Sequence, residues 1–291
     1  MSTLLPDPGV YHDVPFEEYA AWQCVNESTL GLGDVSPLNF KSAMENREQK
    51  ESEAFRDGRA IHTYVLENDK FESQYRVDDE EKVKKRAMEI HRNDSGKPDD
   101  KYEPPKRLKS TKAWEKAEQE FDDGRELIPD SLHRSCKAIH ENFWSNRRIV
   151  DAFPEPKSEV SIVFDLPIGM RCKIRVDLLS ESAKTFGDLK STRNIAWFDC
   201  DIDDFKYHRK MAFYFDGLFY ALGDYYEPWL MPAEKQAPHQ VLAAPLAPEE
   251  IVSGRQAYQR IAYSIVQSTA SGIWPGVPQP DVWRRPKSRR K

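Results

Sequence analysis

Residues 171–180 alternate between apolar and polar side chains up to Leu178. A period of two residues is typical of a β-strand with one buried face. A second strand is expected at 184–190, and a turn near Ser182 would join the two strands into an antiparallel hairpin. In this hairpin the inward side chains of the first strand would be Cys172, Ile174, Val176 and Leu178. The sequence therefore predicts a β-hairpin as the framework of the fold.

Two acidic residues and a lysine lie at matching places on this hairpin. In the predicted register Asp177 lies across from Asp188, and Lys190 points the same way as Asp188 because side chains two residues apart share a face. Facing carboxylates destabilise a sheet by up to about 1 kcal/mol unless a cation lies between them. Magnesium prefers such oxygen ligands, so the spacing indicates a magnesium site. An exposed hairpin whose charged side chains face water fits the spacing equally well.

Two other segments supply further candidates. Residues 158–164 alternate in the same way and would place Glu159 on the polar face of a neighbouring strand. His62 lies in a segment with helical periodicity, and Gly58 on the same face would let a ligand or backbone come close. A single helical histidine is more often a hydrogen-bonded structural residue than a ligand. Both interpretations of His62 stay open on the residues alone.

Taken in chain order, these residues resemble the PD-(D/E)xK nucleases, and within them the RecE or exodeoxyribonuclease VIII type. The resemblance covers most of the chain and rests on the order and spacing of several short motifs. These include Tyr11-His12, Ser28-Thr29-Leu30, Ser36-Pro37, Gly58-Arg59-Ala60-Ile61-His62, Val65-Leu66-Glu67, Phe71, Tyr75, Glu159, Arg175-Val176-Asp177, Asp188-Leu189-Lys190-Ser191-Thr192, Tyr207-His208, Ala212-Phe213-Tyr214, Asp216-Gly217, Trp274-Pro275 and Trp283. It implies an α/β fold in which a mixed central sheet is flanked by helices.

The resemblance also implies a role for each candidate residue. The metal would be held by His62, Asp177, Asp188 and the backbone carbonyl of Leu189. Glu159 matches an acidic position near the metal and its bound waters. Lys190 matches the active-site lysine, which orients or deprotonates the attacking water and offsets charge on the phosphate.

Two positions depart from the family pattern. Val176 stands where a proline is common before the acidic residue, which should matter less because Asp177 itself remains. Lys210 stands where the family usually has glutamine, in a predicted helix that places Tyr207, Lys210 and Tyr214 on one face. These three residues are predicted to bind the substrate. A lysine can hold a phosphate as a point charge but cannot form the hydrogen bonds of an amide, so substrate positioning is expected to differ.

The implied activity is metal-dependent hydrolysis of linear double-stranded DNA from its 5' end, with Mg²⁺ as the cofactor and Mn²⁺ as a substitute. A homo-oligomeric ring around the DNA, a single-strand annealing protein as partner and a role in phage-type recombination are inherited from the same resemblance. Two alternatives remain. They are a restriction-type DNA endonuclease and a non-catalytic DNA-binding protein that retains the nuclease fold.

The length and composition of the chain predict its domain organisation. The 291 residues, 39% of them hydrophobic, predict one nuclease domain over 1–283, with a helical portion at about 1–153 and the catalytic sheet and helices at about 154–272. Residues 284–291 form a basic tail. The net charge of -6 is unlike that of a DNA-binding protein, but basic residues cluster locally, as in 82–86 and this tail.

Several features are expected to be absent. The 4 cysteines are scattered and form no CxxC motif, so no iron-sulfur cluster and no structural zinc are predicted. No segment resembles a nucleotide-binding loop, which argues against ATP dependence. No apolar run approaches the roughly 20 residues that cross a membrane, and the N-terminus has no secretory pattern. A cytoplasmic protein without membrane contact is therefore expected.

Overall fold

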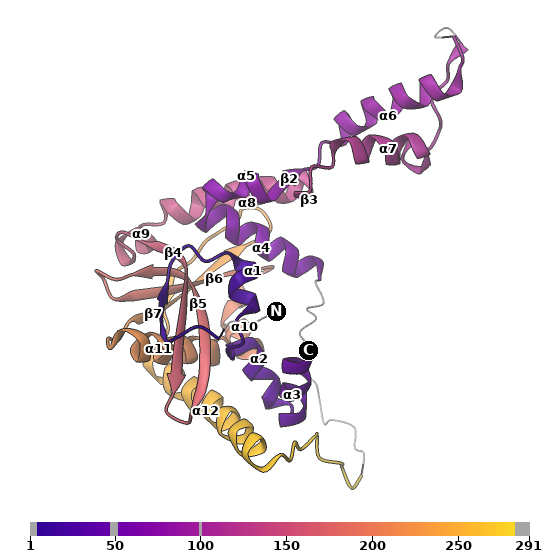
Figure 1. Ribbon diagram of the computed structural model, residues 1–291. Helices are drawn as coiled ribbons and strands as arrows, with labels where there is room; N and C mark the ends of the chain where they lie inside the picture. Colours follow the sequence, from indigo (N-terminus) through magenta and orange to yellow (C-terminus); the bar gives the residue numbers. More distant parts are fainter. Residues whose placement is uncertain (1–4, 47–51, 99–100, 283–291) are drawn as a thin grey trace. The chain divides into compact units, whose positions relative to one another are not determined.

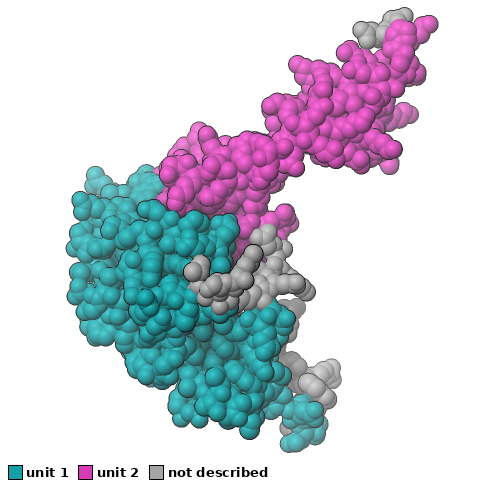
Figure 2. Space-filling model, viewed as in Figure 1, with its two compact units in different colours: residues 1–51, 144–234, 240–291 teal, residues 52–143, 235–239 magenta. Residues whose placement is uncertain are grey.

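The computed structural model describes residues 5–46, 52–98 and 101–282. The chain forms two compact units (Figure 2): unit 1 comprises 1–51, 144–234 and 240–291, and unit 2 comprises 52–143 and 235–239. The predicted basic tail at 284–291 and Trp283 lie outside the described residues. The predicted single nuclease domain over 1–283 stays a prediction.

Unit 1 is built on a mixed sheet, as the sequence predicts. The strand order is β1 (Gly9–Tyr11), β4 (Lys157–Leu166), β5 (Met170–Ser180), β6 (Thr185–Thr192), β7 (Glu227–Glu234) and β8 (Ala244–Pro245). Neighbouring strands are antiparallel except β6 and β7, which run parallel. A parallel pair needs a long crossover, and the chain between these strands forms the helices α10 and α11 (Figure 1).

Helices complete unit 1. Their bounds are α1 (Phe16–Ala21), α2 (Glu27–Gly31), α3 (Pro37–Glu45), α9 (Arg147–Ala152), α10 (Phe198–Asp204), α11 (Tyr207–Leu222) and α12 (Pro248–Ser271), with short 3-10 turns at Leu32–Asp34 and Ile195–Trp197. The α/β prediction is confirmed. None of the described helices of the chain has both the length and the apolar composition that a membrane-spanning helix needs.

Two glycines allow α11 to pack closely on its neighbours. A Cβ at Gly217 would lie 2.7 Å from the ring of Phe164 on β4, and a Cβ at Gly254 of α12 would lie 2.1 Å from the carbonyl oxygen of His208. Neither position can hold a larger side chain without a shift of the backbone. The carboxylate of Asp216 also ties α11 to α12, since it accepts hydrogen bonds from Arg255 at 2.6 and 2.8 Å. These contacts fix the position of α11 in unit 1.

Strand β5 is covered on both faces. Cys172, Ile174 and Val176 lie in the main hydrophobic core, as the alternation predicts. On the other face Lys173 is also buried, and its ammonium donates hydrogen bonds to the carbonyl oxygens of Tyr19 at 2.6 Å and Trp22 at 2.9 Å. The polar face of this strand therefore lies under the N-terminal segment instead of facing open water.

Unit 2 is mostly helical. It contains α4 (Glu53–Leu66), α5 (Asn68–Gln74), β2 (Tyr75–Val77), α6 (Glu80–Ser95), a 3-10 turn at Leu108–Ser110, α7 (Lys112–Phe121), β3 (Glu126–Ile128) and most of α8 (Asp130–Ser145). Strands β2 and β3 form a small parallel sheet. Helices α6 and α7 pack on each other through a separate hydrophobic cluster that includes Val83, Ile90 and Trp114.

Candidate active site

The acidic residues of the hairpin lie where β5 and β6 stop pairing. The last pair of this ladder is Leu178 with Gly187, so Asp177 and Asp188 are the next residues in register but are not part of the ladder. The predicted register is therefore right and the predicted pairing is not formed. In its place the backbone N–H of Leu189 donates to Oδ2 of Asp177 at 2.7 Å.

Glu159 approaches Asp177 from the neighbouring strand β4. Ser158 pairs with Leu178 and Val160 with Val176, which leaves Glu159 at the register position opposite Asp177. Carboxylate oxygens of Glu159 and Asp177 lie within 4.8 Å of each other. Glu159 has φ 53, a left-handed backbone that a residue with a side chain seldom adopts. Residues in such sparsely populated conformations cluster at active sites, although they also occur elsewhere in this chain.

Asp188 lies between two ammonium groups. Its side chain is fully buried, Lys210 donates a hydrogen bond to its Oδ1 at 2.6 Å, and Lys190 forms an ion pair with its Oδ2 that lacks the directional geometry of a hydrogen bond. Each lysine also lies over an aromatic ring of α11: Nζ of Lys190 is 5.3 Å from the ring centre of Tyr207, and Nζ of Lys210 is 5.0 Å from that of Tyr214. Cation–π contacts of this kind add to the ion pairs in holding both lysines in place.

Burial and charge shift the pKa values of these groups in different directions. Burial acts to raise the pKa of Asp188, but the two ammonium groups outweigh it and hold this pKa below its usual value. The pKa of Lys190 is lowered, mainly by burial, and Lys210 adds to this effect. Burial also opposes the charge of Lys210, yet Asp188 raises its pKa well above the ordinary value. Burial and the nearby charge of Asp188 raise the pKa of Tyr207 to about 12. Asp188 and Lys210 are therefore both charged at neutral pH.

The predicted site residues of unit 1 are thus brought together. Asp177, Asp188 and Lys190 come from the hairpin, Glu159 comes from β4, and the predicted substrate-binding residues come from α11, namely Tyr207, Lys210 and Tyr214. The carbonyl oxygen of Leu189, a predicted metal ligand, lies 3.4 Å from Nζ of Lys190. The role of each of these residues stays a prediction.

His62 belongs to unit 2. It lies in the second half of α4 and is half-buried. Its predicted task as a metal ligand likewise stays a prediction.

Arg175 is a site residue that the sequence reasoning missed. Its Nε donates to Oε2 of Glu159 at 2.5 Å, and its Nη1 donates to the carbonyl oxygen of Val14 at 2.8 Å. The signal was present in the sequence, because Arg175 is two residues from Asp177 on the same strand and so shares its face. A basic side chain there offsets the repulsion between the carboxylates of Glu159 and Asp177.

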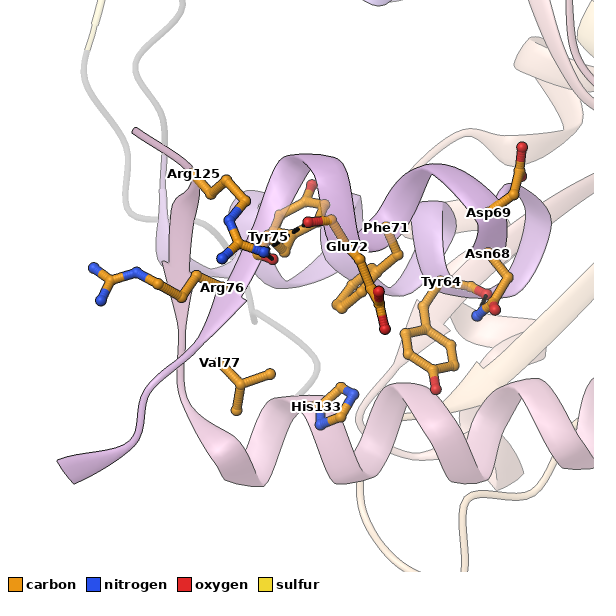
Figure 3. A pocket seen from close by; sticks show the side chains of 10 residues that line it. All are labelled: Tyr64, Asn68, Asp69, Phe71, Glu72, Tyr75, Arg76, Val77, Arg125 and His133. Carbon is orange, nitrogen blue, oxygen red and sulfur yellow. Dashed lines mark hydrogen bonds between the residues drawn. The ribbon is translucent and has the colours of Figure 1, made fainter. Parts of the chain in front are cut away.

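A separate cavity lies within unit 2 (Figure 3). It has a volume of about 470 Å³, and aromatic rings, two arginines and acidic side chains line it. The lining residues are Tyr64, Asn68, Asp69, Phe71, Glu72, Tyr75, Arg76, Val77, Arg125 and His133. None of these is a predicted site residue, so this cavity is distinct from the carboxylate cluster of unit 1.

The architecture of unit 1 defines a class of protein. A mixed sheet flanked by helices, with Asp177 on one strand and Asp188-Leu189-Lys190 on the next, has the organisation of the PD-(D/E)xK proteins. Residues 131–277 match the family described as a PDDEXK-like domain of unknown function (DUF3799). This match spans half of the chain, and the protein belongs to that family.

A solved structure shares the fold. It is the crystal structure of a protein from Eubacterium rectale that is provisionally described as an exonuclease. The TM-score is 0.59 at 13% sequence identity, and the similarity covers 96% of this chain and 97% of that chain. At this identity the likeness shows the fold alone. No curated protein matches the chain.

Proposed function

We propose that this protein is a magnesium-dependent deoxyribonuclease of the RecE type that degrades linear double-stranded DNA from its 5' end. The observation that carries the proposal is the cluster of carboxylates and a lysine next to the point where β5 and β6 stop pairing, made up of Glu159, Asp177, Asp188 and Lys190. Membership of the PDDEXK-like family supports it.

The acidic residues fit a hard divalent cation. The carboxylate oxygens of Glu159 and Asp177 are within 4.8 Å of each other, and oxygen atoms are the ligands that Mg²⁺ and Mn²⁺ prefer. Asp177, Asp188 and the carbonyl of Leu189 would hold the metal, with His62 completing the set as the family resemblance implies. A bound divalent ion would polarise the scissile phosphate and lower the pKa of a water molecule.

In this proposal the two lysines, Lys190 and Lys210, have different roles in cleavage. Burial lowers the pKa of Lys190, which makes its ammonium a better proton donor than that of an ordinary lysine. Lys190 would therefore orient the attacking water or take its proton. Lys210 would contact the phosphate as a fixed positive charge, flanked by Tyr207 and Tyr214.

The wider context of the proposal comes from the family resemblance. A ring of several copies enclosing the DNA, a single-strand annealing protein as partner and a role in phage-type recombination in the cytoplasm are all part of it. These elements can be tested once cleavage is established.

Degradation of linear and covalently closed circular duplex DNA in the presence of Mg²⁺ tests the function. We expect nucleotide release from linear DNA alone, lost on chelation of the metal and lost in Lys190→Met. Lys184→Gln is a matched control, because Lys184 is an exposed lysine of the same unit that pairs with Asp224. Label placed at the 5' or the 3' end would show the polarity.

Two other results would reject the exonuclease. Cutting of the closed circle would favour a restriction-type endonuclease. DNA binding without any cleavage would favour a non-catalytic protein that retains the fold.

A further inference from the structure

The carboxylate of Asp188 is already engaged by positive charge on both oxygens. Oδ1 accepts a hydrogen bond from Lys210 at 2.6 Å, and Oδ2 forms an ion pair with Lys190. A divalent ion such as Mg²⁺ binds a carboxylate oxygen at about 2.1 Å. An ion placed next to Oδ1 would therefore compete with the Lys210 ammonium for the same space and the same charge.

The charges of the cluster balance before any metal is added. The cluster contains three carboxylates, those of Glu159, Asp177 and Asp188, and three basic groups, those of Arg175, Lys190 and Lys210. Glu159 pairs with Arg175, and Asp188 pairs with both lysines. One divalent ion would bring the cluster to a net charge of about +2, and a second would bring it to about +4, by simple addition of formal charges in a buried region where like charges repel strongly. Repulsion therefore opposes the binding of a second divalent ion more strongly than the binding of the first.

The position of Lys210 is fixed by its surroundings. Helix α11 packs closely on β4 at Gly217 and on α12 at Gly254, where a Cβ would meet neighbouring atoms at 2.7 and 2.1 Å. Nζ of Lys210 lies 5.0 Å from the ring centre of Tyr214, and the Lys210 side chain is 23% exposed. These contacts hold the ammonium of Lys210 next to Asp188.

We infer that Lys210 supplies the positive charge that a second divalent ion would otherwise bring, so that this active centre holds one divalent cation per chain. The inference rests on the proposed metal-dependent function. In this arrangement Lys210 neutralises Asp188 on one side and presents its remaining N–H groups to a phosphate oxygen. In centres with two ions, which lie about 3.5–4 Å apart, a metal takes that place.

The test is the number of Mn²⁺ ions bound per chain, measured by titration calorimetry and by the electron paramagnetic resonance signal of free Mn²⁺. We expect one ion in the native chain and two in Lys210→Gln, which removes the charge but keeps a side chain of similar length. Lys210→Met provides a second neutral variant in case the glutamine variant does not fold. Lys184→Gln removes an exposed lysine of unit 1 and should still bind one ion.

The outcomes separate this inference from the proposed function. Two ions in the native chain, or only one ion in both Lys210 variants, would overturn the inference and leave a metal-dependent nuclease standing. No bound Mn²⁺ in the native chain would overturn both. Circular dichroism of each variant establishes that it is folded before its metal content is compared.

Discussion

The backbone N–H of Leu189 on β6 donates a hydrogen bond of 2.7 Å to Oδ2 of Asp177 on β5. This bond joins the two strands directly after their ladder has ended at Leu178 and Gly187. It fixes the carboxylate of Asp177 relative to the segment that carries Asp188 and Lys190.

Asp177→Asn should weaken metal binding without loss of the fold. An asparagine oxygen can still accept the Leu189 hydrogen bond, but the negative charge is lost. Changing a residue that only hydrogen-bonds to a metal ligand already costs about 10–100-fold in metal affinity, so we expect a loss of at least about tenfold in Mn²⁺ affinity by calorimetry. Asp165→Asn, which changes an exposed acid paired with Arg171 on the same sheet, is the control. Equal affinities in the two variants would exclude Asp177 as a ligand.

Asp188→Ala should destabilise the protein strongly. Asp188 is fully buried and is the counter-ion of both Lys190 and Lys210. Removing one partner of a buried ion pair typically costs about 3–5 kcal/mol, because the remaining charge stays buried. We expect a loss of this size in urea unfolding, partly recovered when Lys210→Met is added. If the double variant is no more stable than the single one, the two lysines do not depend on Asp188 for their charge balance.

Gly254→Ala should destabilise unit 1 through the contact between α12 and α11. The added Cβ would lie 2.1 Å from the carbonyl oxygen of His208, which is backbone and cannot rotate away. Overpacking of this kind costs about 1–3 kcal/mol. Ser253→Ala, at an exposed position of the same helix, should change stability by less than about 0.5 kcal/mol. Thermal unfolding of the two variants makes the comparison, and equal midpoints would contradict the close packing.

The cysteines should differ sharply in reactivity. Cys24, Cys136 and Cys172 are buried, whereas Cys200 is exposed. Burial raises the pKa of Cys136 to about 12, so its thiol stays protonated and unreactive as the pH rises from about 7 to about 9. We expect a thiol reagent to modify one cysteine in the native chain and the other three only after denaturation.

Cys200→Ser should then abolish the native reaction. Modification of a further cysteine in the native chain would show that one of the buried positions opens to solvent.

The sequence predicted the strands of the site well because local alternation determines which side chains share a face. The alternation at 171–180 predicted β5, and the run at 184–190 after a turn near Ser182 predicted β6 and the shared direction of Asp188 and Lys190. The end of the ladder at Leu178 and Gly187 could not be predicted, since it depends on how the two strands separate. The left-handed backbone conformation of Glu159 likewise cannot be predicted from the pattern of residue types.

The contact between Lys210 and Asp188 depends on tertiary structure. Helical periodicity placed Tyr207, Lys210 and Tyr214 on one face of α11, which the helix confirms. The distance of that face from β6 is set by close packing at Gly217 and Gly254, and packing between elements leaves no local signal in the sequence. The sequence therefore showed that Lys210 departs from the family pattern, but it did not predict that Lys210 contacts Asp188.

Unit 2 consists of two stretches of chain that are far apart in the sequence, 52–143 and 235–239. Asn142 donates a hydrogen bond of 2.8 Å to the carbonyl oxygen of His239, and Lys235 pairs with Asp57 at 3.6 Å. A fragment limited to the first stretch would lose both contacts. Unit 2 is therefore not encoded by one continuous segment of the chain. A version of unit 2 grafted onto another protein would have to include residues 235–239 as well as 52–143.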